Sequence, residues 1–314
     1  MLVVLGQVTV DHVVPAAPGP WRAALGGNAL YAAAGARLWY DPARIGVVSR
    51  IGRGLPEDVA KLLEGAGLPV EGLGRIEAEH LVEWMLYEED GSRRSLPRNP
   101  ALREPTADAG DLRRRYLARL EALSPTAEDV PPAWLPARAV HLAPQVAARH
   151  RLSVGPLRGR TPFLSVDPSP HYARELDAPG LARLLAEASA FLPSRAEVEH
   201  LGTDGDWPAL VGRLRAAGFA EVVLKLGGDG CLVSGPGAAR PEAVPAARAA
   251  VADLTGAGDA FCGAYAAARA VGLPPVEAGR RAVVAAAMVI ECAGATAALA
   301  LSPAEARRRL EVSR

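Results

Sequence analysis

The chain has 314 residues, of which 50% are hydrophobic and 22% are charged, a balance typical of folded globular proteins. Its 35 basic and 35 acidic residues leave no formal net charge, which argues against a dedicated nucleic-acid surface. A chain of this length is expected to form one large core with at most a small appendage, because single cores stop growing at about 250 to 300 residues. The 32 glycines and 27 prolines indicate many short connections rather than a helical bundle.

Cysteine usage and hydrophobic runs predict the cellular compartment. Cys231, Cys262 and Cys292 form no C-x-x-C pair, and an odd number in apolar surroundings favours reduced, buried thiols. The apolar run 2–5 has no basic segment before it, so a signal peptide does not fit. The run 282–290 is far shorter than the roughly 20 residues of a membrane span. We therefore expect a cytoplasmic protein with neither a membrane nor a nucleic acid as partner.

Strand-like and helix-like stretches alternate along the chain. Short apolar runs that predict buried strands occur at residues 2–5, 139–142, 163–166 and 222–226. Amphipathic helices are predicted at 57–67 and 208–218, each ending at a glycine. This alternation is typical of a parallel sheet covered by helices on both faces.

Two segments break the alternation and predict a second, smaller sheet. Residues 80–87 are rich in β-prone side chains, and the turn signal at 88–92 leads back into 93–96, which indicates a hairpin. Residues 9–14 are also extended and continue into the proline-rich segment 15–20. We predict that these pieces form a β lid over the main domain.

The predicted fold is therefore α/β, with a mostly parallel central sheet, helices on both faces and a small β lid. We expect the main domain to comprise residues 1–10, 25–73 and 99–314, and the lid to comprise 11–24 and 74–98.

The most informative stretch is residues 253–259, with the sequence DLTGAGD. Gly256 and Gly258 flank Ala257 immediately before a predicted helix, so the backbone amides of this turn are unobstructed at a helix N-terminus, where anions bind. Asp259 lies at the start of the helix, within reach of a hydroxyl that attacks a bound phosphate. The alternative is that Asp259 is only a helix N-cap.

This stretch resembles the C-terminal signature of the ribokinase-like, or PfkB, carbohydrate and nucleoside kinases. The resemblance extends over essentially the whole chain. Near the N-terminus, a predicted strand ends at Gly6, Asp11 follows in a lid strand, and the pair Gly26 and Gly27 begins a helix, as in the family. Residues 225–230, KLGGDG, are similar to the family's strand and glycine turn near the nucleotide.

The resemblance implies a ribokinase-like fold and ATP-dependent phosphorylation of a hydroxymethyl group on a small polyhydroxylated substrate, such as a sugar. It implies ATP and Mg²⁺ as cofactors and leaves activation by K⁺ open. The implied site residues are Asp259 as general base with Gly256, Ala257 and Gly258 as the anion hole; Asp11, Gly26, Gly27 and Asn28 for the substrate; Lys225, Gly227, Gly228, Gly230 and Thr255 for the nucleotide; Glu197 for magnesium through water; and Asp253 for a monovalent cation.

Several of these residues also have a structural interpretation. Asp11 could be a turn aspartate at a strand end, and Lys225 could be a surface lysine whose charge reaches solvent. The glycines at 227, 228 and 230 could form only a hairpin turn, which is compatible with a role at the nucleotide.

The chain departs from the family pattern at a few positions. Tyr31 stands where the family usually places a substrate-binding asparagine, and Asn28 is the candidate substitute. In the family's Asn-x-x-Glu motif, Ser194 replaces the asparagine and Glu197 is retained. Leu254 occupies a position where threonine or serine is usual. Magnesium keeps several waters and needs few protein ligands, so the loss of one amide is tolerable.

These features leave several functions to compare. A nucleoside kinase is the alternative within the family, with Trp84 and Tyr31 as candidates for stacking on a base. A catalytically silent sensor or interaction protein is the alternative outside the enzyme class, motivated by Ser194 and Tyr31. An NAD-binding oxidoreductase lacks support, because Phe261 takes the place of the third glycine of the dinucleotide fingerprint.

The predicted lid suggests two further features. The pair Arg93 and Arg94 could meet an acidic substrate, although a solvated hairpin end is the simpler interpretation. The apolar lid strand at 81–86 is a candidate interface for a homodimer.

Overall fold

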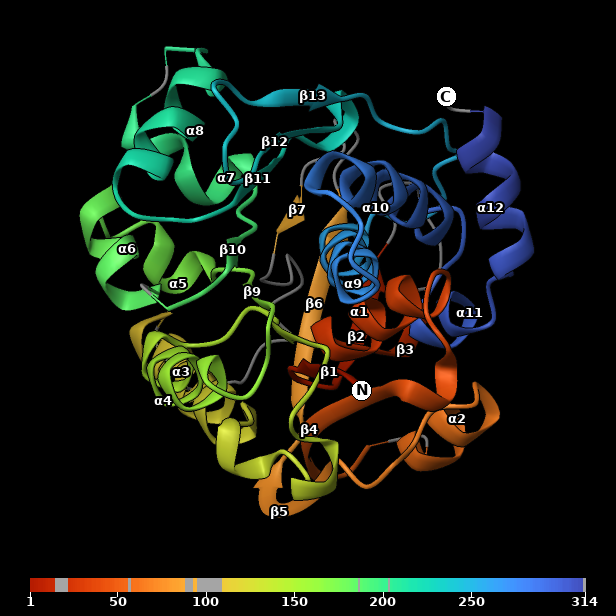
Figure 1. Cartoon of the computed structure of the whole chain (residues 1–314). Helices are drawn as coiled ribbons and strands as arrows, with labels where there is room; N and C mark the ends of the chain where they lie inside the picture. The colour runs from red at the N-terminus through yellow and green to blue at the C-terminus, as the bar shows by residue number, and fades with distance from the viewer. Residues whose placement is uncertain are drawn as a thin grey trace.

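A nine-stranded sheet forms the centre of the computed structural model, which describes residues 1–14, 22–55, 58–87, 93–94, 109–185, 187–202 and 204–312 (Figure 1). The strands lie in the order β13 (Glu242–Val244), β12 (Cys231–Ser234), β11 (Val222–Lys225), β10 (Ala190–Phe191), β9 (Leu164–Val166), β8 (Ala139–Leu142), β1 (Leu2–Leu5), β4 (Ile45–Arg53) and β5 (Leu73–Glu79). The pairs from β11 to β5 are parallel, and β12 and β13 add an antiparallel edge. The predicted mostly parallel sheet is confirmed, and all four predicted strands are present.

Helices cover both faces of this sheet, and the strands carry apolar side chains toward each. In β1, Leu2 joins one core cluster, whereas Val3 and Leu5 join the other. The first cluster contains residues of α1 (Asn28–Arg37), α2 (Val59–Gly65), α9 (Ala257–Ala270), α10 (Pro275–Val289), α11 (Ala295–Leu299) and α12 (Pro303–Val312). The second contains residues of α4 (Ala147–Arg158), α5 (Pro170–Ala173), α6 (Ala178–Leu185), α7 (Arg195–Val198) and α8 (Trp207–Ala216). Burial on both sides explains why these strands read as continuous apolar runs.

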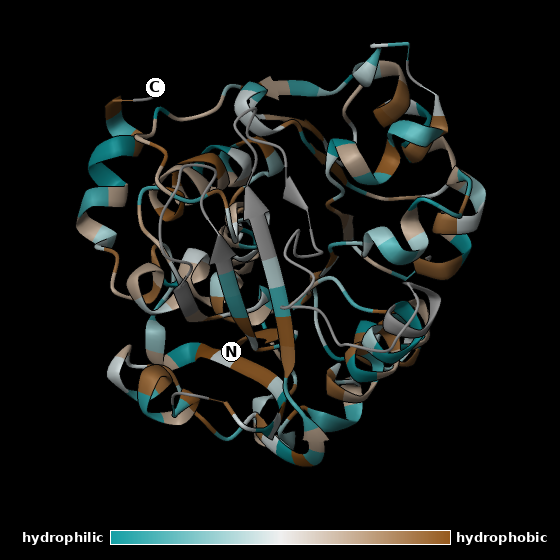
Figure 2. Ribbon diagram, turned by 180° about the vertical axis from the view of Figure 1, so that it is seen from behind, coloured by the Kyte–Doolittle hydropathy of each residue, from teal (hydrophilic) through white to brown (hydrophobic). Residues whose placement is uncertain are grey.

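The remaining helical elements lie at the edges. Helix α3 (Ala109–Leu123) packs against the small sheet, where its Leu120 and Leu123 meet Leu81. Short 3₁₀ helices are η1 (Pro42–Arg44), η3 (Ala127–Asp129), η4 (Pro132–Trp134), η5 (Glu199–Leu201) and η6 (Gly227–Asp229). Figure 2 shows α12 with a largely hydrophilic surface beside the C-terminus. Within the described ranges, we find no helix with the length and hydrophobicity that crossing a membrane requires.

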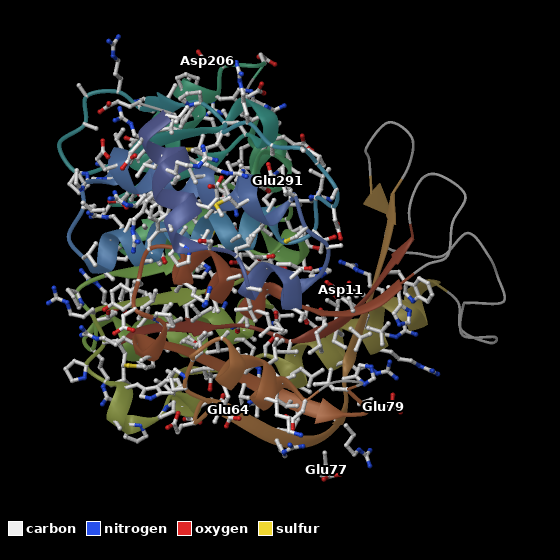
Figure 3. All side chains as sticks on the ribbon, turned by 90° about the vertical axis from the view of Figure 1, so that its right-hand side faces the viewer. Asp11, Glu64, Glu77, Glu79, Asp206 and Glu291 are labelled. Atoms are coloured by element: carbon white, nitrogen blue, oxygen red, sulfur yellow. The ribbon has the colours of Figure 1, made fainter. Side chains whose placement is uncertain are left out.

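A four-stranded sheet stands out from the body of the molecule (Figure 3). Its order is β3 (Arg22–Gly26), β2 (Thr9–Val14), β6 (Leu81–Tyr87) and β7 (Arg93–Arg94). Strands β6 and β7 pair antiparallel, and β2 pairs parallel with β6, so the predicted hairpin and small sheet are confirmed. The predicted turn at 88–92 and the proline-rich segment 15–20 lie outside the described residues.

The structure does not follow the predicted domain boundaries at two points. The boundary predicted at residue 74 falls inside β5, which pairs with β4 of the large sheet. The boundary predicted at residue 25 falls inside β3, which pairs with β2 up to Gly26. Both errors arise because an extended segment looks the same in sequence whichever sheet it joins. The division into a main domain and a lid remains a prediction.

Helices α1 and α9 touch through their backbones. A Cβ atom at Gly263 of α9 would overlap the carbonyl group of Ala32, and one at Gly35 of α1 would overlap that of Ala260. These glycines are required because only hydrogen fits between helices at such close approach. The contact holds the middle of α1 against the first two turns of α9.

Candidate active site

The turn before α9 has the geometry of an anion-binding helix start. Gly256 is the N-cap and adopts a left-handed conformation with φ of 79°, which a residue with a side chain rarely adopts. The Ala257 amide donates to the Leu254 carbonyl at 3.4 Å, and the Ala260 amide donates to the Gly256 carbonyl at 2.9 Å. Amides of a first helical turn generally lack an acceptor within the helix and are available to anions. Asp259 is the third residue of α9 and is half-buried. The simple N-cap interpretation of Asp259 is therefore wrong, because Gly256 occupies that position.

Tyr31 joins this turn to the substrate side of the predicted site. Its ring packs directly against Gly256, where a Cβ atom would clash with it. The residue is only 2% exposed. Burial, and the nearby carboxylates of Asp11, Asp253 and Asp259, raise the pKa of the Tyr31 phenol well above its ordinary value, so it stays protonated. Tyr31 thus lies near three of the predicted site carboxylates, which come from β2, from the turn and from α9.

Asp11 lies at the base of the small sheet, where it meets the body of the molecule (Figure 3). It is inside β2 rather than at its end, so the interpretation as a turn aspartate is wrong. Its Oδ1 accepts a hydrogen bond from Thr9 Oγ1 at 2.5 Å, and the side chain is buried. A Cβ atom at Gly26 would overlap the Asp11 carboxylate, so Gly26 makes room for this group.

Gly27 and Asn28 form the start of α1. Gly27 is the N-cap with φ of 101°. The Asn28 amide bonds within the protein: its Nδ2 donates to Gln7 Oε1 at 2.6 Å and to the Pro144 carbonyl at 2.9 Å, and its Oδ1 accepts from the Gln7 amide at 2.8 Å. These bonds tie α1 to the end of β1 and compete with the predicted contact between Asn28 and substrate, which remains a prediction.

Lys225 is buried at the carboxyl end of β11, so the surface-lysine interpretation is wrong. Its Nζ forms an ion pair with Asp167 Oδ2 at 2.5 Å. A Cβ atom at Gly258 would lie 3.6 Å from Nζ, which places the ammonium beside the anion-binding turn. Asp167 was not among the site residues predicted from the sequence. The available signal was a polar residue directly after a buried strand, the edge where parallel sheets bind ligands.

The glycine turn after Lys225 connects β11 to the antiparallel β12, which confirms the hairpin interpretation. Gly227 and Gly228 are exposed, and no atom within 4 Å would meet a Cβ on either. Gly230 differs, because a Cβ there would clash with the backbone of the segment after β13. Two glycines thus leave an open surface, and the third allows close packing.

Glu197 and Ser194 form a capping box at the start of α7. The Ser194 amide donates to Glu197 Oε2 at 2.7 Å, and Glu197 is buried. The Lys225 amide donates to the Pro193 carbonyl at 2.8 Å, which holds this turn beside the end of β11. Across the part of the chain that the structure describes, no group of three or more His, Cys, Asp or Glu side chains is placed to hold a metal ion.

Asp253 and Thr255 shape the segment that leads into the turn. The Thr255 amide donates to Asp253 Oδ1 at 2.9 Å, and both residues are buried. The amides of Ala252 and Asp253 donate to the Ile290 carbonyl at the end of α10. The segment is therefore fixed to α10 before it reaches Gly256.

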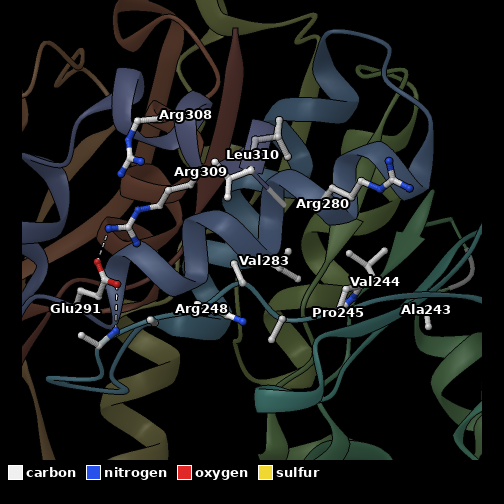
Figure 4. Close-up of a pocket in the computed structure, with 15 residues that line it drawn as sticks. Ala243, Val244, Pro245, Arg248, Arg280, Val283, Glu291, Arg308, Arg309 and Leu310 are labelled. Atoms are coloured by element: carbon white, nitrogen blue, oxygen red, sulfur yellow. Dashed lines mark hydrogen bonds and ion pairs between the residues drawn. The ribbon is translucent and has the colours of Figure 1, made fainter. Parts of the chain in front are cut away.

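A cavity of about 970 Å³ lies immediately upstream of this segment (Figure 4). Residues 243–250 line one side, and α10 and α12 line the others. Four arginines contribute to the wall: Arg248, Arg280, Arg308 and Arg309. Glu291 closes one end, since it accepts from Arg309 at 2.8 Å and from the Ala250 amide at 3.1 Å. No pattern in the sequence had pointed to this cavity.

The comparisons with known proteins agree with the geometry of the site. The family model described as "pfkB family carbohydrate kinase" matches residues 2–301. A curated relative, 2-dehydro-3-deoxygluconokinase of Escherichia coli K12, is 40% identical over 88 residues. That match spans 27% of this chain and only 28% of the relative's own length.

Solved structures share the fold over the whole chain. The nucleoside kinase of Burkholderia thailandensis in complex with ADP-inosine is 16% identical, with a TM-score of 0.75 over 100% of this chain and 96% of the other. The ribokinase of Arabidopsis thaliana complexed with ribose and ATP is 19% identical, with a TM-score of 0.66 over 99% of this chain and 98% of the other. The predicted ribokinase-like fold is confirmed.

Proposed function

Because the chain belongs to the pfkB family of carbohydrate kinases, we propose that it transfers the γ-phosphoryl group of ATP to a hydroxymethyl group of a small sugar or sugar-like molecule. One observation carries this proposal: the left-handed turn at Gly256, the half-buried Asp259 and the buried ammonium of Lys225 lie together at one edge of the sheet. Amides, a cation and a carboxylate are the groups that phosphoryl transfer to a hydroxyl requires.

In the proposed reaction, the acceptor hydroxyl attacks the γ-phosphorus in line with the leaving group. The new oxygen–phosphorus bond forms as the bond to the β–γ bridging oxygen breaks, and ADP leaves. Asp259 accepts the hydroxyl proton. The turn amides from Gly256 to Gly258 and the Lys225 ammonium stabilise negative charge on the transferring group, which is usually the largest contribution to such catalysis.

The acceptor would lie between the small sheet and the first turns of α1 and α9. Asp11 would accept hydrogen bonds from its hydroxyl groups, and Gly26 and Gly27 would allow it close to the helix start. We propose that residues 11–24 and 74–98 act as a lid that excludes water from the phosphoryl group, with the part of this range in β5 remaining on the body.

The donor nucleotide would extend from the turn toward the arginine-lined cavity. The cavity's wall at residues 243–250 continues directly into the segment that ends at Gly256, and the exposed Gly227 and Gly228 leave room beside Lys225. Thr255 is buried in the same segment and would support the nucleotide site from the protein interior. The arginines would favour a polyanionic nucleotide.

Magnesium fits Glu197. Its carboxylate uses Oε2 for the Ser194 amide, so Oε1 remains as a hard oxygen acceptor, the type that Mg²⁺ and its water shell prefer. When bound, Mg²⁺ would neutralise charge on the nucleotide phosphates. Asp253 is the candidate near a monovalent cation, although its carboxylate already shapes the turn by accepting from Thr255.

We propose a sugar rather than a nucleoside as the acceptor. The two aromatic rings that could stack on a base both have protein contacts: the buried Tyr31 packs against Gly256, and the half-buried Trp84 lies edge-on to His12 at 4.5 Å between ring centroids. The partial match to 2-dehydro-3-deoxygluconokinase makes sugar acids the first class to test.

We also propose a cytoplasmic enzyme that dimerises through its small sheet. The predicted interface strand 81–86 lies in β6, which is an inner strand between β2 and β7 and offers no edge. The outer strands of that sheet in the described residues are β3 and β7, and unpaired strand edges are templates for association. Light scattering at micromolar concentration tests this, and a monomer would contradict it.

The deciding experiment measures ADP release from Mg-ATP with pentoses, hexoses, sugar acids including 2-dehydro-3-deoxygluconate, sugar phosphates and nucleosides. Asp259→Asn is run in parallel. We expect activity on one class and a loss of about a hundredfold or more in the variant, as for removal of a positioned base. Silence across the panel, with ATP still bound, would favour the catalytically silent sensor instead.

A further inference from the structure

Asp167 and Lys225 form a buried ion pair. The proposed reaction gives Asp167 no role. Asp167 directly follows β9, and Lys225 ends β11, so both lie at the carboxyl edge of the parallel strands. Their side chains are 3% and 10% exposed, and Nζ lies 2.5 Å from Oδ2. Burying two charges costs so much desolvation that such pairs add little net stability. The pair therefore needs an explanation other than stability.

The pair is attached to the first turns of α9. Cys262, a free and buried cysteine four residues after Gly258, has its Sγ 3.4 Å from Lys225 Nζ and 3.3 Å from Asp167 Oδ2. Residues four apart lie on the same side of a helix, so Cys262 and Gly258 present one surface to the ammonium. The ammonium is thereby held between the Asp167 carboxylate and the turn.

Asp167 is not arranged as a purely structural carboxylate. Its Oδ1 is buried and has no hydrogen-bond partner among the residues that the structure describes. A structural carboxylate of this chain, Glu221, accepts from Tyr265 on one oxygen and pairs with Arg269 on the other. Leaving a buried carboxylate oxygen unsatisfied lowers stability, so the geometry serves the position of the ammonium instead.

We infer that Asp167 is a positioning residue for phosphoryl transfer, which holds the Lys225 ammonium beside Gly258 so that its charge adds to that of the turn amides. This inference rests on the proposed function. A charge fixed before the reaction needs no reorganisation when negative charge develops, and low exposure limits its screening by water. Without this partner, the Lys225 side chain could adopt other rotamers that place its ammonium away from Gly258.

Charged and titratable groups from four neighbouring elements face Lys225. They are Asp167 after β9, Cys262 of α9, Glu197 of α7 and His141 of β8, and Asp259 of α9 in turn acts on Asp167. Burial alone would lower the pKa of Lys225, but Asp167, with Cys262 and Glu197, raises it above its ordinary value. Burial and the Lys225 charge lower the pKa of His141 to about 3, so this neighbour is neutral.

The test compares Asp167→Asn, Lys225→Met and the double variant, with ADP release measured on the acceptor found above. We expect Asp167→Asn to lower kcat by about ten- to a hundredfold, as loss of an orienting partner does, and to leave the acceptor KM within about twofold. In the Lys225→Met background, Asp167→Asn should have no further effect on kcat, because Asp167 acts through the ammonium. Glu221→Gln is the matched control, since it alters a buried ion pair at the other end of β11.

The outcomes separate this inference from the proposed function. An active wild type in which Asp167→Asn keeps its kcat overturns the inference alone, as does an equal loss in the Lys225→Met background. A wild type that releases no ADP on any acceptor overturns both. If Asp167→Asn does not fold, the double variant removes both charges together, and a kcat equal to that of Lys225→Met supports the inference while a further loss overturns it.

Discussion

Strand β11 has a buried ion pair at each end, and α9 contributes to both. At the amino end, Glu221 pairs with Arg269 at 3.2 Å and accepts from Tyr265 at 2.7 Å. At the carboxyl end, Lys225 pairs with Asp167, and Cys262 contacts both. The amino-end carboxylate has a partner for each oxygen, whereas Asp167 has one oxygen without a partner in the described structure.

The two ion pairs differ in where their cations lie relative to the dipole of α9. Arg269 lies near the C-terminus of α9, where a cation is favoured by the helix dipole, and its guanidinium also packs over the Phe163 ring at 5.0 Å. Lys225 lies at the N-terminus of the same helix, where the dipole disfavours a cation and favours an anion. A cation held at that end gains nothing from the helix dipole, and in the proposed function it would serve an anionic ligand.

The largest effect we expect from this comparison concerns stability at the amino end. Glu221→Gln keeps an acceptor for Tyr265 but removes the charge that compensates Arg269. The free energy of unfolding should fall by about 2 kcal/mol, because a partly buried cation loses its counter-charge. Urea unfolding measures this, and steady-state kinetics should show kcat unchanged within about twofold. A large loss of kcat without loss of stability would contradict the view that only the ion pair at the carboxyl end of β11 serves the reaction.

The second prediction places a methyl group at the carboxyl end. In Gly258→Ala the new Cβ would lie 3.6 Å from Lys225 Nζ, an ordinary contact, so the fold should tolerate it. We expect kcat to fall by about tenfold, because the methyl group intrudes between the turn and the ammonium. Stability should be unchanged or raised by up to about 1 kcal/mol, since alanine favours helix.

The matched control for that variant is Gly212→Ala in α8, where no atom lies within 4 Å of the new Cβ. It should show the same gain in stability and an unchanged kcat. Equal kinetics for the two variants would show that nothing at position 258 faces the reaction.

The smallest expected effect is a change in pH profile. In the wild type, Asp167 raises the pKa of Lys225 above its ordinary value of 10.5, so the ammonium persists and kcat should not decline between pH 7 and 9 on its account. In Asp167→Asn, burial lowers this pKa without that opposition, so the ammonium loses its proton as pH rises. Because Glu197 remains nearby, we expect only a several-fold loss of kcat by pH 9. A parallel profile in both proteins would contradict the role of Asp167.

Much of the fold was predictable from sequence because local patterns carry it. The apolar runs at 2–5, 139–142 and 222–226 became β1, β8 and β11, and the segment 208–218 became α8 with its apolar side inward. The boundary predicted at 74 failed, because β5 reads as an extended segment and only its pairing with β4 assigns it to the large sheet.

The turn at Gly256 was predicted from one short stretch of sequence. The family resemblance came from that stretch together with Gly6, Asp11, the pair at 26–27 and residues 225–230, and the family is confirmed over residues 2–301. Contacts between residues that are far apart in the chain could not be predicted. Asp167 is 58 residues from Lys225, and no spacing rule connects residues on separate strands. Tyr31 could not be placed either, because its contact with Gly256 depends on how α1 meets α9. The hydrogen bond that Asn28 donates to Gln7 likewise could not be predicted, because it depends on the folded chain.

The backbone contact between α1 and α9 has a consequence for how this protein could acquire a new acceptor. Gly35 and Gly263 lock the two helices at a distance that neither can change without losing the contact. In the proposed function, the start of α1 would bind the acceptor and the turn before α9 would bind the phosphoryl group, so both sites belong to helices whose separation is fixed where they cross. A larger or smaller acceptor would then not be accommodated by moving the helices apart. Evolution toward a different acceptor would instead act on the small sheet, whose strands can vary while the helix crossing stays fixed.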